Sequence, residues 1–286
     1  MAGQSVTFTA AVSVNVPGAG TPTGTVTFSD GSTQLGTATL NGSGMATITT
    51  SSLAVGSHIV TATYGGDGNY TGSKSSVTQT VNKIATTTTL ASSANPSIIG
   101  APLTYTATVS PASGTGTPTG TVAFTDGGTP ISECGSVTVS TTGTATCPVT
   151  YTAAGSHRIT AAYSGDATNA ASTSAALVQQ VAYKVRLQYD PTKASNSGTT
   201  VPVKIQLLNA SGTNLSASAT TVTLTGLSPS PTPGNAPTGT FTYQILDQGP
   251  GYQLNVKTSG YPAGTYTLSF TVSGDPTVHT AQFVIG

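Results

Sequence analysis

Two cysteines, three histidines and eight acidic residues are the side chains with which this chain could do chemistry. Paired carboxylates could act as general acid and base or bind calcium, and a cluster of histidines and carboxylates could bind zinc. Two cysteines could form a disulfide, or one of them could act as a nucleophile beside a histidine. Which chemistry is available depends on the elements that position these residues.

A segment that occurs three times positions many of them. Each copy holds a strand between two turn signals and runs from a glycine to an aspartate eleven residues later: Gly56 to Asp67, Gly155 to Asp166 and Gly264 to Asp275. The copies are 99 and then 109 residues apart. A period near 100 residues is typical of one immunoglobulin-like sandwich. The sequence therefore predicts an all-β fold, with three tandem immunoglobulin-like β-sandwiches arranged as an extended rod.

The repeat predicts three domains, at residues 1–82, 83–182 and 183–286. The junctions at 81–83 and 181–183 are short and lack runs of glycine and serine. Such junctions allow little slack, so we expect the domains to stack end to end.

Alternating residues and turn dipeptides predict the strands. Apolar residues alternate over 6–12 in the first repeat and over 103–109 in the second, as in half-buried strands. The dipeptides that favour two-residue hairpin turns, in which both central residues need positive φ, are Asp30-Gly31, Asp126-Gly127 and Asn41-Gly42.

Five of the eight acidic residues lie in turn positions, where aspartate accepts hydrogen bonds from nearby backbone: Asp30, Asp67, Asp126, Asp166 and Asp275. Asp30 and Asp67 follow strands expected to run antiparallel, which separates them by a strand length, on the order of 20 Å. That distance excludes a general acid–base pair and a shared calcium ion. A calcium ion at a domain junction, bound by Asp67 or Asp166 and linker carbonyls, stays open as an alternative.

The histidines favour packing over metal binding. His58 and His157 occupy the same position of the first two repeats, and Tyr266 occupies it in the third. His279 is alone, and zinc sites need three or four ligands. We therefore predict no metal site, no cofactor and no catalytic residue.

The two cysteines, Cys134 and Cys147, align at an offset of 99 with two apolar residues of the first repeat, Leu35 and Ile48. If the Asn41-Gly42 turn closes a hairpin of two central residues, Leu35 faces Ile48 across it. The cysteines would then be neighbours, which predicts a disulfide between them. Persistent disulfides need an oxidising compartment, and this favours an extracellular location.

The third domain holds 6 of the 11 tyrosines. Exposed tyrosine rings could stack on sugars, and the candidates for this ligand stacking are Tyr243, Tyr252, Tyr261 and Tyr266. The alternative is that the rings pack in the core and at its edges. In the same domain, alternation places Lys204 with Gln206 on a solvated strand face.

Charge and hydropathy exclude two classes of partner. The chain has 8 basic and 8 acidic residues and no net charge, whereas nucleic acids and anionic membranes are bound through Lys and Arg. No apolar run approaches 18 residues, so no membrane insertion is expected. No signal peptide opens the chain, so we infer secretion from other features.

The segments GTVTFSDG and LAVGSHIVTATYGGDGNYTGS resemble the bacterial Ig-like domain that occurs in tandem on large secreted and surface proteins. This resemblance covers nearly all of residues 1–182. YKVRLQYDPTK followed by VPVKIQLLNASGTNL resembles the PxKF domain that often closes such arrays, with Ile205 in place of the phenylalanine. The resemblance implies an extracellular, structural or adhesive setting in a bacterium.

The first repeat has no counterpart of residues 85–97, because Gly100 of the second repeat aligns with Gly3. The gap favours either a fragment boundary or an open sheet edge that accepts a strand from a preceding domain or another chain. In both cases we expect the first domain to be the least stable.

Together these patterns predict a non-enzymatic extracellular stalk or adhesin segment of a bacterial surface or secreted protein, spacing or presenting a binding region. Its expected partners are the other domains of the array and a cell-surface protein or glycan. The alternative is a carbohydrate-binding accessory module of a larger secreted hydrolase, which exposed tyrosines on the third domain would favour.

Overall fold

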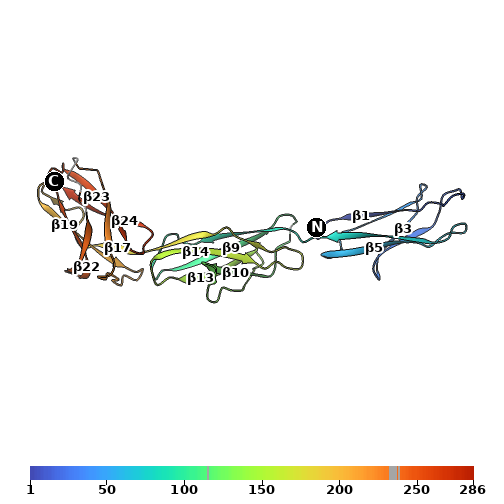
Figure 1. Cartoon of the computed structure of the whole chain (residues 1–286), viewed down its shortest axis with the longest axis horizontal. Coiled ribbons are helices and arrows are strands. Elements are labelled where there is room, and N and C mark those ends of the chain that lie inside the picture. Colours follow the sequence, from blue (N-terminus) through green and yellow to red (C-terminus); the bar gives the residue numbers. More distant parts are fainter. Residues whose placement is uncertain (115, 232–236, 238) are drawn as a thin grey trace. The chain divides into compact units, whose positions relative to one another are not determined.

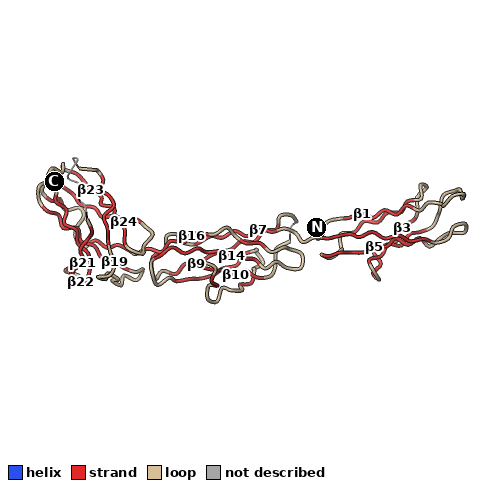
Figure 2. The backbone as a smooth tube through the Cα atoms, in the orientation of Figure 1, coloured by secondary structure: helices blue, strands red, loops and turns tan. Residues whose placement is uncertain are grey.

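The computed structural model describes all residues except 115, 232–236 and 238, and regular structure in the described residues is β-strand throughout (Figures 1 and 2). The all-β prediction is therefore confirmed. None of the described residues belongs to a helix with the length and apolar character needed to cross a membrane.

The chain divides into two compact units. The first contains Met1–Thr87, Val109–Gly120 and Tyr163–Ser172; the second contains Thr88–Thr108, Thr121–Ala162 and Thr173–Gly286. The three predicted domains and their arrangement as a rod stay a prediction.

Residues 1–82 form two sheets. One pairs β1 (Val6–Ala11) with β4 (Met45–Thr50). The other has the order β3-β2-β5-β6, formed by β3 (Thr33–Thr39), β2 (Thr25–Asp30), β5 (Gly56–Tyr64) and β6 (Ser73–Val81). Alternate side chains of both sheets point inward and form one core, which includes Phe8, Val26, Phe28, Val60 and Tyr64.

The second repeat has a three-stranded sheet where the first has two strands. Its order is β13-β9-β7, formed by β13 (Thr144–Thr150), β9 (Pro102–Pro111) and β7 (Thr86–Ser92). The other sheet has the order β11-β10-β14-β16-β8, with β12 and β15 beside it. Its strands are β8 (Ser97–Ile98), β10 (Thr121–Asp126), β11 (Thr129–Pro130), β12 (Val137–Thr138), β14 (Gly155–Tyr163), β15 (Ser172–Thr173) and β16 (Leu177–Ala182).

The described residues of 183–286 form one eight-stranded path, β17-β19-β22-β21-β20-β23-β24-β18. The strands are β17 (Lys184–Leu187), β18 (Ala194–Ser195), β19 (Thr200–Leu208), β20 (Val222–Ser228), β21 (Thr240–Leu246), β22 (Gly249–Lys257), β23 (Gly264–Val272) and β24 (Val278–Ile285). Short pairing of β20 with β21 joins the two halves of this path, and a core rich in aromatic residues lies inside it.

Two of the predicted hairpins are present, with their turns one residue later than predicted. Asp30 pairs with Thr33 and Asp126 with Thr129, so each aspartate ends a strand and the glycine after it opens the turn. In the first turn Gly31 has a positive φ (55°), whereas Ser32, the second turn residue, does not. The aspartates are therefore strand residues, and their side chains can reach the neighbouring strand.

The predicted two-residue turn at Asn41-Gly42 is wrong. Positive φ occurs at Gly44 (72°), and Asn41 O accepts a hydrogen bond from Gly44 N (2.9 Å). The Asn41 side chain also accepts bonds from the Ser43 and Met45 backbone, which stabilises a longer loop. The flanking strands β3 and β4 belong to different sheets, so the chain crosses the sandwich at this point.

Candidate functional site

Cys134 and Cys147 form a disulfide with a Cα–Cα distance of 5.7 Å. The two cysteines are neighbours for a reason other than the predicted hairpin. Cys147 lies in β13, whereas Cys134 lies in the loop between β11 and β12, on the opposite sheet. The bond therefore links the two sheets of the sandwich through its core, and both cysteines are buried.

Each of the first two repeats contains a histidine–aspartate pair that the sequence analysis missed. His58 Nδ1 lies 2.7 Å from Asp30 Oδ2, and His157 Nδ1 lies 2.6 Å from Asp126 Oδ2. The pairs form because β2 and β10 each end at the aspartate and lie beside β5 and β14, the strands that contain the histidines. The signal was present in the sequence, since both partners recur together in the two repeats.

The ring of His58 is also held from its other side. His58 Nε2 lies 2.8 Å from Ala54 O, and Tyr266 of the third segment donates to the Pro262 carbonyl, which is likewise four residues earlier. A histidine or a tyrosine can therefore close the same turn. This agrees with a packing role for the position.

We expect His58 to titrate above pH 6.5. The Ala54 carbonyl, and after it the Asp30 carboxylate, raise the pKa of His58 above its ordinary 6.5. A raised folded-state pKa means that the pair stabilises the fold fully below pH 6.5, and that this contribution is lost as pH rises through the folded-state pKa. The pKa of His58 can be measured from its ring NMR shifts between pH 5 and pH 9.

The Asp30→Asn variant is the matched control for this titration. It removes the Asp30 carboxylate, the second cause of the raised pKa, and keeps the Ala54 carbonyl. The pKa of His58 should therefore fall part of the way toward 6.5. A wild-type His58 that titrates below 6.5 would contradict the prediction.

Asp67 and Asp166 close the same loop in their two repeats. Asp67 Oδ2 accepts bonds from Thr23 N and Oγ1 (both 2.8 Å), and its Oδ1 accepts bonds from the Asn69 and Tyr70 backbone. The Thr23 N–H, followed by the Asn69 N–H, holds the pKa of Asp67 well below its ordinary value.

In the second repeat, Asp166 accepts the equivalent bonds from Thr119 N (2.8 Å) and Asn169 N (2.7 Å). Burial alone would raise the pKa of Asp166, but hydrogen bonds from Thr119, Asn169 and Thr168 hold it well below its ordinary value. Both carboxylates are thus used by local donors, which satisfies the oxygens that the alternative calcium site would need. Among the described residues, no three His, Cys, Asp or Glu side chains are grouped to hold a metal ion.

The third segment uses its histidine differently. His279 Nε2 lies 2.8 Å from Asp275 Oδ2, which also accepts a bond from Tyr183 N (2.8 Å). Burial would raise the pKa of Asp275, but hydrogen bonds from His279 and Thr277 lower it. Asp275 therefore ties the start of this segment to the turn after β23.

Three of the four tyrosines named for ligand stacking are buried. Tyr252, Tyr261 and Tyr266 are 0%, 2% and 2% exposed, and their rings belong to the core. Tyr243 is half-buried and packs edge-on against Tyr252, with 5.7 Å between the ring centroids. The buried rings present no face to a sugar.

The expected solvated face around Lys204 is only partly present. Lys204 Nζ lies 3.5 Å from Asp247 Oδ2, an exposed carboxylate. Gln206 is fully buried, contrary to the alternation argument, and its Nε2 donates to the Gln248 and Pro250 carbonyls (both 3.0 Å). The hydrogen bonds that this amide donates to Gln248, between β21 and β22, and to Pro250, at the start of β22, compensate its burial.

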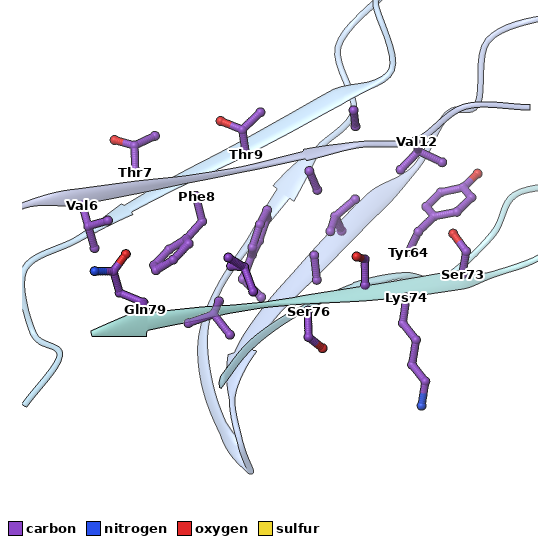
Figure 3. A pocket seen from close by; sticks show the side chains of 18 residues that line it. Val6, Thr7, Phe8, Thr9, Val12, Tyr64, Ser73, Lys74, Ser76 and Gln79 are labelled. Atoms are coloured by element: carbon purple, nitrogen blue, oxygen red, sulfur yellow. The ribbon is translucent and has the colours of Figure 1, made fainter. Parts of the chain in front are cut away.

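A cleft of about 490 Å³ opens between β1 and β6 of the first repeat. We call it the β1–β6 cleft; its walls are residues 6–12 of β1 and its extension, residues 73–77 and Gln79 of β6, and core side chains beneath them. Figure 3 shows Val6 and Phe8 pointing into it from β1, while Thr7 and Thr9 point to the opposite side. Gln79 points into it from β6 (Figure 3). The sequence analysis predicted the strand at residues 6–12 and gave an open edge as one of two alternatives, but it did not name the β6 residues or Gln79.

The family model of the bacterial Ig-like domain (group 3) matches residues 1–82 and 88–182, which together are more than half of the chain. The match ends at residue 182, so the resemblance of residues 183–286 to a PxKF domain stays a prediction. Among curated proteins, none matches this chain in sequence.

Solved structures with low sequence identity are similar to this chain. Invasin, described as a bacterial integrin-binding protein, is 17% identical, with a TM-score of 0.44 over 100% of this chain and 57% of its own. The Escherichia coli adhesin FdeC is 17% identical, with a TM-score of 0.29 over 99% of this chain and 93% of its own. The D0-D1 domain of intimin is 18% identical, with a TM-score of 0.27 over 70% and 96%. At these identities the functions of those proteins do not carry over to this chain.

Proposed function

This chain belongs to the bacterial Ig-like domain (group 3) family, and from that premise we propose that it is a non-enzymatic stalk or adhesin segment of a bacterial surface or secreted protein. Its role is to space or present a binding region. The partners we propose are the other domains of the array and a cell-surface protein or glycan.

One observation carries this proposal: in both matched repeats the side chains that could do chemistry are tied into the same structural contacts. The aspartate after β5 or β14 closes a loop, and the histidine at the start of that strand bonds the aspartate of the neighbouring strand. A duplicated catalytic or metal site would instead leave such groups facing a shared cavity. Duplicated structural contacts are what a repeated spacer needs.

Two further features support an extracellular stalk. The buried disulfide suits an oxidising compartment. Within the second compact unit, Ala210 N donates to Ile99 O (2.8 Å), a bond between residues of the predicted second and third domains. Such a bond limits slack at the short junction near residue 182.

The buried tyrosines do not favour the carbohydrate-binding alternative.

Small-angle scattering tests the stalk. Three sandwiches end to end should give a maximum dimension of about 110 Å. Inserting eight Gly/Ser residues between Ala182 and Tyr183, after the end of β16 and before β17, is the matched control, and it should broaden the distance distribution because flexible linkers sample many separations. A compact wild-type particle, or one that the insertion leaves unchanged, would contradict a stiff spacer.

A further inference from the structure

The outer face of one sheet in residues 183–286 gathers half of the basic residues of the chain. Core side chains alternate along β17, β19, β22 and β21, so the residues between them point outward. We call these outward residues the polar sheet face. Five of the eight Lys and Arg residues lie in this segment, at positions 184, 186, 193, 204 and 257. Four of them are on the polar sheet face: Lys184, Arg186, Lys204 and Lys257.

The register places these four cations in a diagonal stripe. Lys184 and Arg186 of β17 lie opposite residues 208 and 206 of β19. Lys204 is in β19 itself, and Lys257 of β22 lies opposite Thr200. At about 3.3 Å per residue, their levels along β19 are about 7, 7 and 13 Å apart, and the stripe is about 26 Å long. An extended anionic chain can therefore contact all four cations.

Side-chain amides lie among the cations. Gln253 is opposite Lys204, and Asn255 is two residues further along β22. Gln244 Nε2 donates to Gln253 Oε1 (2.6 Å), and Gln253 Nε2 donates to Asn255 Oδ1 (2.7 Å). These bonds fix the three amides in a row that ends at the exposed Asn255. Because the row is already ordered, binding a ligand costs it little further side-chain entropy.

The buried Gln206 orients the cation beside it. Its Nε2 donates to the carbonyls of Gln248 and Pro250, and its Oε1 accepts a bond from Arg186 Nη2. Gln206 is 0% exposed, whereas Arg186 is exposed, so a fixed amide holds a guanidinium that faces solvent. Within the described part of the chain, the ion pair of this face is Lys204 with Asp247 (3.5 Å). The face is therefore cationic and ordered before any ligand binds.

The groups on the polar sheet face match one class of ligand. Amides donate and accept hydrogen bonds, as sugar hydroxyls do, and Lys and Arg pair with carboxylates. Nucleic-acid bases would need aromatic rings to stack on, and the rings of these strands belong to the core or pack against it: Phe241, Tyr243 and Tyr252. A protein partner would need an apolar centre, and the exposed apolar residue at an outward position of these described strands is Pro202.

We propose that the polar sheet face binds an acidic polysaccharide, a chain of sugars that carry carboxylates, along the stripe from Lys184 to Lys257. The lysines and Arg186 pair with the carboxylates, and Gln253 and Asn255 bond the hydroxyls. This inference deepens the proposed function, on which it rests, because it gives the glycan partner a chemical class. It also assigns the binding region to residues 183–286, outside the two matched repeats.

Calorimetric titration of the full chain with a galacturonate oligosaccharide, which has one carboxylate per sugar, tests the proposal. We expect saturable binding in 50 mM NaCl that is at least about tenfold weaker in 300 mM NaCl, since salt screens exposed charges. The methyl-esterified oligosaccharide keeps its hydroxyls and loses its charges, whereas polyglutamate has carboxylates and no sugar hydroxyls. Each should bind at least about tenfold more weakly than galacturonate, because each lacks one of the two kinds of contact.

Variants of the chain locate the site. Lys184→Gln, Lys204→Gln and Lys257→Gln should each weaken binding about threefold, and together at least about tenfold, as exposed ion pairs do. Asn255→Ala should weaken galacturonate binding about threefold without any change of charge. Lys193→Gln is the matched control: it removes the same charge from the turn between β17 and β18, and it should bind like the wild type. Unchanged urea midpoints show that each variant is folded.

Three results would overturn the proposal. The first is no saturable binding of galacturonate. The second is a loss in Lys193→Gln as large as in Lys257→Gln, because net charge and not this face would then attract the polymer. The third is equal binding of polyglutamate, which would make an acidic protein the occupant. None of these results alters the scattering that tests the stalk, and a compact particle in scattering leaves the titration as it is, so the two failures can be told apart.

Discussion

Opening the Cys134–Cys147 disulfide is expected to destabilise residues 83–182 by about 3 kcal/mol, the value for a closed loop of this size. The two cysteines are 13 residues apart and join the two sheets through the core, so their loss frees the unfolded chain and removes an inter-sheet link. Hydrogen exchange within β9, β13 and β14 measures the change, because it reports this segment separately from the rest of the chain.

The Cys134→Ala/Cys147→Ala variant and the reduced wild type should show the same faster exchange. Adding reductant to the variant is the control and should have no further effect. Exchange within β1 to β6 should be unchanged, because that repeat carries no cysteine. Equal exchange in oxidised and reduced wild type would mean that packing alone holds the two sheets together.

Replacing Asp166 by asparagine is expected to destabilise the second repeat by about 1–2 kcal/mol at pH 7. Hydrogen bonds to a charged acceptor contribute more than neutral ones, and the lower part of their range applies because this carboxylate is partly solvated. Thr119 N and Asn169 N donate to different oxygens of Asp166, so the NH2 group of asparagine would face one of these two N–H donors. Hydrogen exchange at increasing urea concentration measures the loss in the free energy of unfolding of the second repeat.

The effect should depend on pH with a defined sign. The pKa of Asp166 is lowered from 3.8 in the folded state, so its contribution is present above about pH 4 and is lost as pH falls through the folded-state pKa. The difference between wild type and Asp166→Asn should therefore shrink between pH 4 and pH 2. Asp247→Asn is the matched control, since the ion-pair partner of that exposed carboxylate is Lys204 at 3.5 Å, and it should change stability by less than about 0.5 kcal/mol. A constant difference across this range would rule out the charge as its cause.

Local patterns predicted the strands well and the turns less well. Alternation over 6–12 and 103–109 corresponds to β1 and β9, because a strand with one buried face must alternate. The turn at Gly31 lies one residue later than predicted, since a single positive φ at the glycine suffices there. At Asn41 the dipeptide signal failed, because the chain crosses between sheets and a hairpin register does not exist.

The disulfide shows a correct pairing reached through a wrong geometry. The exchange of two apolar residues for two cysteines in equivalent positions indicated proximity, whichever way the strands are connected. The hairpin that was meant to bring them together is absent, and contact across the core does so instead.

The sequence by itself determined the strand content, the repeat, the cysteine pair and the turn positions of Asp67, Asp166 and Asp275, because these depend on local alternation, on turn chemistry and on comparison of one repeat with another; Asp30 and Asp126, predicted in turns, end strands instead. Only the tertiary structure decided which sheet each strand joins, which histidine meets which aspartate, that Gln206 is buried, and that Gln79 faces an open cleft. These depend on how distant strands are placed across a sandwich, and a pattern of period two specifies the face of each strand without specifying its neighbour.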